Sequence, residues 1–221
     1  QTPDVPNPFF LTLAPDRRTL YSTWSPQFGG PDGEEIAAWR IGGRDGELAP
    51  LGRQSCRGRG PCYVETDPSG RALLVANYVD GSVAAMPLAA DGRPGPAATF
   101  LRHSGSSVNP DRQKQPYAHA IIPAPPAAGG TTSRFAYAAD LGTDQILCYR
   151  LDAAPATLVP HDPPFARTPP GAGPRHLRFH PQGRVLYCIN ELANTIGVYA
   201  FDPDTGALVE RQVISTLPED F

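Results

Sequence analysis

The sequence predicts an all-β protein, a β-propeller of four-stranded antiparallel blades, and three observations carry this prediction. A pair of prolines seven residues apart occurs four times, so one structural unit is repeated along the chain. Each repeat contains short apolar segments separated by turn-forming residues, as hairpin-linked strands do. No long window sustains helical periodicity. The four pairs are Pro8 and Pro15, Pro61 and Pro68, Pro116 and Pro123, and Pro174 and Pro181.

The repeats divide residues 1–221 into blades of a single propeller, predicted at residues 8–60, 61–115, 116–173 and 174–221. In the last blade the segments HPQG, NELAN and DPDTG separate strand candidates at residues 175–179, 184–189, 194–201 and 208–213. An apolar run follows the second proline of each pair, as in RALLVAN and RVLYCIN. We expect the first strand of every blade to be innermost and to line a central channel.

Composition fits a globular protein with a buried core and narrows the class of partner. The chain has 221 residues, of which 40% are hydrophobic, and a formal net charge of −3. This charge disfavours a broad nucleic-acid or anionic-membrane surface, and no apolar stretch reaches the roughly 18 residues that span a bilayer. No spacing of Cys and His resembles a zinc site, so neither a metal nor another cofactor is predicted. We expect a cytoplasmic protein, with export left open because the chain starts at Gln1.

The four cysteines do not fix the compartment. Cys148 and Cys188 lie inside strand candidates, where cysteine behaves as a small buried hydrophobic residue. Cys56 and Cys62 flank the segment RGRGP and are either free thiols or a disulfide.

A polar segment, HSGSSVNPDRQKQ at residues 103–115, joins the second and third repeats. One interpretation is a solvated connection between blades. The other is a loop over one mouth of the channel, where Arg112 or Lys114 meets an anionic group.

Two repeats place an ionisable residue where the others carry an apolar or small one. Three residues after its leading proline the third repeat has His119, and one residue after its proline the fourth has Arg175. Positions two apart share one face of a strand, so both side chains are predicted to face the channel from neighbouring inner strands. Glu191 follows the second strand of the fourth repeat and is therefore expected beside Arg175.

These three residues are the candidate catalytic group, because a His, an Arg and a Glu together can supply acid–base chemistry and stabilise an oxyanion. The competing interpretation is a salt bridge that seals one blade, with His119 hydrogen-bonded in the core. Four further polar or aromatic residues at the same end of the strands are candidate substrate-binding residues. They are Tyr117, Asn77, Asp140 and Asn190.

Several motifs resemble the seven-bladed β-propeller lactonases, which include bacterial 6-phosphogluconolactonases and the carboxy-cis,cis-muconate lactonising enzyme. These motifs are ANYVDGSV, PYAHAI, YAADLGTDQILCYRL, GPRHLRFHPQGRVLYCINELANTIGVY and QVISTLPEDF. The resemblance implies active-site roles for His119, Arg175 and Glu191. The chain departs from many bacterial members at Tyr117, where they carry His, and it accounts for four blades rather than seven.

The resemblance implies an enzyme that hydrolyses a sugar lactone to the acid without a cofactor. Two alternatives stay open: a muconate-type lactonising cycloisomerase, and a non-catalytic propeller that binds a protein or a carbohydrate, since propellers host many functions. The expected partner is a small lactone, with neither nucleic acid nor membrane. Four blades taken from a larger ring would also leave apolar edges open, so self-association is expected.

Overall fold

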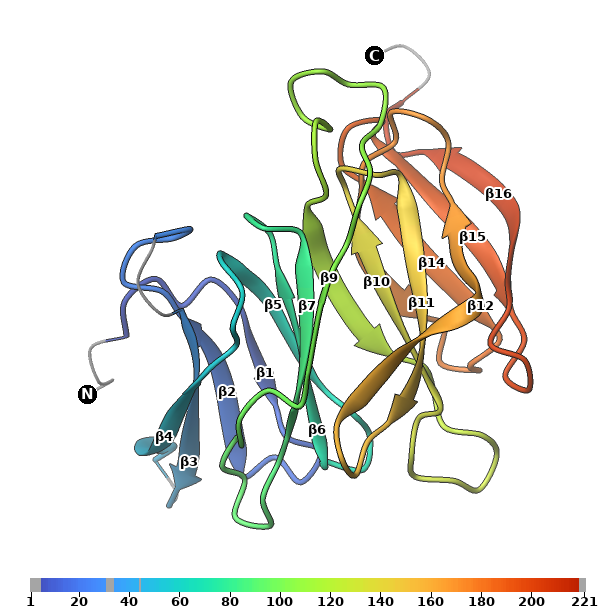
Figure 1. The fold of residues 1–221 in the computed structure, drawn as a ribbon. Helices are drawn as coiled ribbons and strands as arrows, with labels where there is room; N and C mark the ends of the chain where they lie inside the picture. The colour runs from blue at the N-terminus through green and yellow to red at the C-terminus, as the bar shows by residue number, and fades with distance from the viewer. Residues whose placement is uncertain (1–4, 31–33, 44, 219–221) are drawn as a thin grey trace.

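The computed structural model describes residues 5–30, 34–43 and 45–218, and within these ranges the chain forms four antiparallel sheets and no helix (Figure 1). The predicted all-β propeller architecture is confirmed. The last residues of the fourth predicted repeat, 219–221, lie outside the described part. Within the described part, no helix is long and apolar enough to cross a membrane.

Each sheet contains four strands that pair in sequence order, as hairpin connections require. The first sheet comprises β1 (Leu11–Leu13), β2 (Thr19–Trp24), β3 (Glu35–Gly42) and β4 (Glu47–Ser55). The second comprises β5 (Pro61–Thr66), β6 (Ala72–Asn77), β7 (Ser82–Pro87) and β8 (Thr99–Arg102). The third comprises β9 (Ala118–Pro123), β10 (Phe135–Asp140), β11 (Gln145–Asp152) and β12 (Thr157–Arg167). The fourth comprises β13 (Pro174–Phe179), β14 (Val185–Asn190), β15 (Thr195–Phe201) and β16 (Leu208–Ser215).

The first strands of the four sheets stand next to one another, as predicted. Strand β5 contacts β1 on one side and β9 on the other, and β9 also contacts β13. These strands begin at the same end of the molecule, where the long loop of residues 103–117 rises above the start of β9 (Figure 1). The starts of the inner strands therefore form one mouth of the channel.

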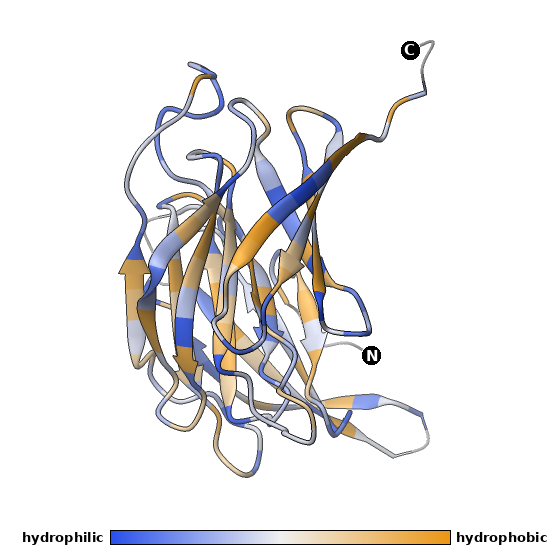
Figure 2. Cartoon of the chain, turned by 90° about the vertical axis from the view of Figure 1, so that its right-hand side faces the viewer, coloured by the Kyte–Doolittle hydropathy of each residue, from blue (hydrophilic) through white to orange (hydrophobic). Residues whose placement is uncertain are grey.

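Burial shows which sheets lie between two neighbours. Every residue of β6 and of β10 is buried, because another sheet covers each face. Strand β14 of the last sheet instead alternates between buried and exposed residues. Figure 2 views the molecule from the side of this sheet and shows apolar residues interspersed with polar ones along its strands. The apolar core accordingly lies between the sheets.

All four cysteines are buried and free, so Cys56 and Cys62 do not form a disulfide. Cys62 packs against the next inner strand, where its thiol lies 3.3 Å from the carbonyl oxygen of His119. Burial raises the pKa of this thiol to about 12, so it stays protonated at neutral pH. It behaves as a packing residue that joins two blades.

Candidate active site

The three predicted catalytic residues meet at the mouth of the channel. His119 lies in β9, Arg175 in β13, and Glu191 in the turn that follows β14. The Arg175 Nε–H lies 3.1 Å from His119 Nε2 and 3.1 Å from Glu191 Oε2. His119 Nε2 and Glu191 Oε2 are 3.9 Å apart. The Arg175 Nε–H thus donates to the imidazole, and the same guanidinium forms an ion pair with the carboxylate.

Strand register corrects one detail of the sequence prediction. The sequence pattern gave His119 and Arg175 positions in their repeats that differ by two residues. In the structure their positions are equivalent, because each is the extra residue of a β-bulge, as Cys62 is in β5. The reason is that β9 begins two residues after Pro116, whereas β13 begins at Pro174 itself. A bulge re-aims the side chain of its extra residue, so both side chains still point to the same mouth.

His119 is a neutral imidazole held in a dry environment. The residue is only 6% exposed, and its Nδ1 has no hydrogen-bond partner among the described residues. Burial lowers the pKa of His119 to about 4, and the charge of Arg175 acts in the same direction. At neutral pH the ring is therefore an acceptor at Nε2, with its proton on Nδ1.

Glu191 is held between two arginines. Its Oε1 lies 2.5 Å from the Arg112 Nη2 of the loop above β9, and its Oε2 lies 3.1 Å from Arg175 Nε. The Glu191 side chain is 29% exposed and that of Arg175 is 40% exposed, so this cluster is wet on one side. The hydrogen bond to Glu191 raises the pKa of Arg112 further above its ordinary value. The loop of residues 103–115 thus covers the channel mouth and is no plain solvated connection.

Aromatic side chains form the wall and the floor of the site. Tyr117, a predicted substrate-binding residue, stacks on Tyr78 with ring centroids 4.8 Å apart. Tyr78 in turn meets His119 edge to face at 5.3 Å. Deeper in the channel, His176 lies 5.4 Å from His119 and 5.6 Å from Tyr63, ring centre to ring centre. The residues that surround His119 are therefore largely aromatic, which explains its desolvation.

The remaining predicted substrate-binding residues hold the turns beneath the site. Asn77 and Asp140 have no exposed surface, and Asn190 is 1% exposed. Asn77 donates to the Ser82 hydroxyl, and Asp140 Oδ1 accepts the N–H of Tyr117 at 2.9 Å. Their hydrogen bonds are made within the protein, where they shape the turns beneath the site; that Asn77 and Asp140 bind substrate stays a prediction. Asn190 borders the open side of the site, beside Glu191.

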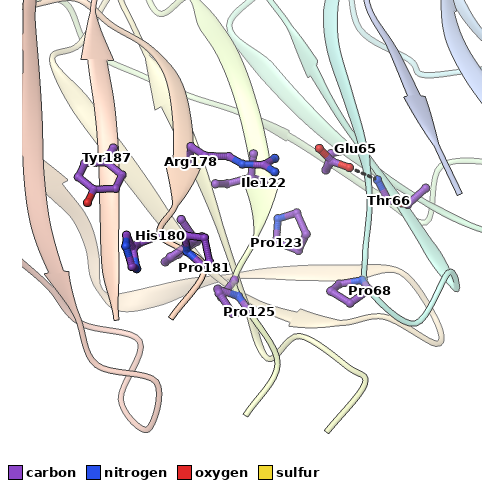
Figure 3. Close-up of a pocket in the computed structure, with 12 residues that line it drawn as sticks. Glu65, Thr66, Pro68, Ile122, Pro123, Pro125, Arg178, His180, Pro181 and Tyr187 are labelled. Atoms are coloured by element: carbon purple, nitrogen blue, oxygen red, sulfur yellow. Dashed lines mark hydrogen bonds between the residues drawn. The ribbon is translucent and has the colours of Figure 1, made fainter. Parts of the chain in front are cut away.

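Two hollows occur at opposite ends of the inner strands. One, of about 480 Å³, adjoins the site but is not lined by His119; its lining residues are Arg175, Ile189, Asn190, Glu191, Asn194 and Thr216. The other, of about 590 Å³, lies at the far end between Glu65, Ile122 and Arg178 (Figure 3). The three predicted catalytic residues do not line the far hollow. Among the described residues, no group of three or more His, Cys, Asp or Glu side chains is arranged to hold a metal ion.

Sequence reasoning missed His176 and Tyr78 and left the role of Arg112 open. His176 directly follows Arg175, and Tyr78 directly follows Asn77, so both stand next to residues that were singled out. The repeat register already places Tyr78 at the turn position that Glu191 occupies two blades later, and this equivalence is the signal that could have found it. The backbone N–H of Tyr78 donates to the carbonyl oxygen of Gly60, just before β5, and that of Glu191 donates to the carbonyl oxygen of Gly173, just before β13. Arg112 carried no signal beyond its charge.

The fold is a β-propeller, and the site is a cluster of His119, Arg175 and Glu191 at one mouth of its channel. Over residues 1–221 the chain matches the family described as "Lactonase, 7-bladed beta-propeller". It is 33% identical to a 6-phosphogluconolactonase of Bacillus subtilis over 218 residues, which is 97% of this chain and 57% of that protein. It is 32% identical to a 6-phosphogluconolactonase of Pectobacterium carotovorum over 222 residues, covering 100% of this chain and 59% of the relative.

A solved structure is similar in fold as well. The periplasmic gluconolactonase of Pseudomonas aeruginosa superposes with a TM-score of 0.89 and 32% identity, covering 100% of this chain and 61% of that one. The chain belongs to the seven-bladed β-propeller lactonase family. It spans less than two thirds of the length of these relatives, in keeping with the four sheets described.

Proposed function

We propose that the protein acts as a lactone hydrolase, opening a sugar lactone to the corresponding acid. The observation that carries the proposal is the contact between the neutral His119 nitrogen and the Arg175 guanidinium, 3.1 Å apart at matching bulges of neighbouring inner strands. A base and a cation held side by side are what ester hydrolysis requires. The named activities of the relatives, 6-phosphogluconolactonase and gluconolactonase, support the same reaction class.

In the proposed reaction a water molecule attacks the lactone carbonyl. His119 Nε2 accepts a proton from this water as the new carbon–oxygen bond forms, and Arg175 stabilises the charge that develops on the carbonyl oxygen. The bond between the carbonyl carbon and the ring oxygen then breaks. The proton on His119 passes to the departing ring oxygen, which becomes a hydroxyl, and the imidazole returns to its neutral form.

Glu191 serves as a positioning residue in this scheme. Arg175 hydrogen-bonds His119 and forms an ion pair with Glu191, so Glu191 keeps Arg175 in place when a water takes over the hydrogen bond to His119. Neighbouring Tyr117 and Tyr78 supply a flat wall against which the apolar face of a sugar ring can pack. We assign the lactone to the mouth where His119, Arg175 and Glu191 meet; the hollow bordered by Arg175 and Glu191 opens next to it.

The test is hydrolysis of a panel of phosphorylated and unphosphorylated sugar lactones by the 221-residue chain and by any longer protein that contains it. Spontaneous hydrolysis is subtracted, and ring closure of muconates is measured in parallel, since the competing cycloisomerase activity would use the same groups. His119→Ala should lower turnover by roughly 10²–10⁴. The control His180→Ala, at the far end of β13, should not.

Two outcomes would overturn the proposal. One is the absence of hydrolysis above the uncatalysed rate by folded protein of either length. The other is full activity in stable His119→Ala. Binding of a carbohydrate or protein without any turnover would favour the non-catalytic alternative.

We also propose a cytoplasmic location. The four free cysteines support it, because oxidising compartments favour disulfides. The periplasmic relative is the counterexample, so fractionation of cells that make the native protein is the measurement. Recovery with periplasmic markers would overturn this assignment.

A further inference from the structure

The loop of residues 103–117 is anchored to the propeller by a buried side chain. Gln113 has no exposed surface, although its neighbours on both sides are exposed. Its Nε2 donates to the carbonyl oxygen of Leu141 at 2.9 Å and to Asp144 Oδ1 at 2.7 Å. Its Oε1 accepts the N–H of Asn109 at 3.1 Å. A fully bonded, buried glutamine fixes the backbone on either side of it, so the adjacent Arg112 leaves the loop in a defined direction.

That direction is across the channel mouth. Arg112 belongs to the connection between the second and third sheets, yet its Nη2 reaches Glu191 of the fourth sheet at 2.5 Å. A guanidinium has five N–H donors, and the contact with Glu191 occupies only part of them. The side chain is 45% exposed, so the remaining donors are open to a ligand that enters the mouth.

The charges around the mouth do not balance. His119 is neutral, since burial lowers its pKa to about 4. Glu191 therefore contributes the only negative charge in this cluster of described residues, against the two positive charges of Arg112 and Arg175. Hydrolysis of a neutral lactone calls for one cation, at the carbonyl oxygen. Arg112, the second cation, is partly exposed and has donors beyond its bond to Glu191, so it is available to another anionic group.

We propose that Arg112 is a specificity-determining residue, which binds an anionic substituent that the lactone carries away from its reacting ester. A planar guanidinium with free donors matches a phosphate or a carboxylate by paired, charge-assisted hydrogen bonds. Arg175 then stabilises the charge on the ester carbonyl oxygen, and Arg112 determines which lactones bind. This inference rests on the proposed function, because it takes the ligand to be a lactone. The anion site itself can be tested by binding alone.

Three acids that differ only at carbon 6 test the proposal: 6-phosphogluconate, glucarate and gluconate, which carry there a phosphate, a carboxylate and a hydroxyl. Their affinity for the 221-residue chain is measured by calorimetry at fixed ionic strength. We expect the wild type to bind one or both of the acids that carry an anionic group at carbon 6 more tightly than gluconate. Arg112→Gln should weaken that preference about tenfold or more, as loss of a charge-assisted contact does.

Lys114→Gln is the matched control, because it removes the same charge from the same loop two residues away. It should leave the preference unchanged within about threefold, since a screened surface charge contributes little. Arg112→Lys keeps the charge and loses the planar fork, so it should fall between the wild type and Arg112→Gln. This conservative variant also serves if Arg112→Gln does not fold.

The proposal is overturned if the wild type does not distinguish the three acids, if Arg112→Gln keeps the wild-type preference, or if Lys114→Gln reduces it equally. These results are separate from the fate of the lactonase proposal. A chain that binds 6-phosphogluconate through Arg112 but hydrolyses no lactone keeps the anion site and refutes the enzyme. A chain that hydrolyses charged and neutral lactones at the same rate, with or without Arg112, supports the lactonase and refutes the anion site.

Discussion

Asp144 joins three segments that carry the site, and its replacement should destabilise the protein strongly. Its Oδ1 accepts from Gln113 Nε2 and from the Gly173 N–H, each at 2.7 Å. Its Oδ2 accepts from the Ser107 hydroxyl at 2.5 Å and from the Gly171 N–H at 2.6 Å. The residue is 4% exposed. One carboxylate thus ties the Arg112 loop to the turn from which the strand of Arg175 begins.

The substitution Asp144→Gly isolates this role. Asp144 has a φ of 54°, and Gly81 and Asn194 hold the corresponding turn positions with φ of 58° and 52°. Glycine therefore fits the backbone, and only the carboxylate is lost. The hydrogen bonds from Gln113 and Gly173 are buried, whereas water can replace those from Ser107 and Gly171. Counting only the two buried donors at about 1.5–3 kcal/mol each predicts a loss of roughly 3–6 kcal/mol in the free energy of unfolding.

Urea denaturation of the wild type and the variant measures this loss from the shift in midpoint at equal slope. The control is Asn194→Gly, at the corresponding turn of the last sheet, whose side chain donates no hydrogen bond within the described protein. We expect the control to change stability by less than about 1 kcal/mol. If Asp144→Gly lowered the free energy of unfolding by no more than the control does, the carboxylate would not hold these segments together, and the prediction would be wrong.

Three further predictions concern the site and the terminal sheets. Above pH 6.5 the His119 imidazole is neutral in both states, but between 6.5 and about 4 only the unfolded chain binds the proton, so acid should destabilise the fold. From about pH 7 to about pH 4.5 the wild type should lose roughly 2–3 kcal/mol more than His119→Gln; equal losses would contradict this. Arg175→Ala should lower turnover strongly yet cost less than about 1 kcal/mol of stability, because its ion pair with Glu191 is partly exposed; a loss of 3–5 kcal/mol would make the pair structural. The isolated chain should self-associate in sedimentation velocity through exposed apolar residues such as Leu11 (56%) and Val209 (51%), and Leu11→Ser should weaken this; a wild-type monomer at every concentration would refute it.

The sequence by itself determined the architecture, because repetition and local patterning are written in consecutive residues. The recurring proline pair and the apolar runs between turns predicted four sheets of four strands, with the first strand innermost. Side-chain alternation and turn chemistry act over a few residues, so they can be read without tertiary structure. His119, Arg175 and Glu191 were also visible, because each breaks the pattern set by the other repeats.

The register of those residues was decided by tertiary structure. A bulge adds a residue to one strand without a clear mark in the sequence. Counting from the leading prolines therefore gave His119 and Arg175 positions that differ by two, whereas their bulges make the two positions equivalent. The burial of Asn77 and Asp140 was also decided by tertiary structure, since the sequence pattern of a polar turn residue is the same whether it is exposed or hydrogen-bonded inside the protein.

Arg112 shows most clearly what sequence could not supply. It lies 79 residues before Glu191, and nothing local marks the pair. The contact exists because the propeller brings the second and fourth sheets around one channel, and because Gln113 and Asp144 hold the intervening loop over its mouth. Local patterning determined which strands form, and the arrangement of the sheets around the channel decided which charges meet.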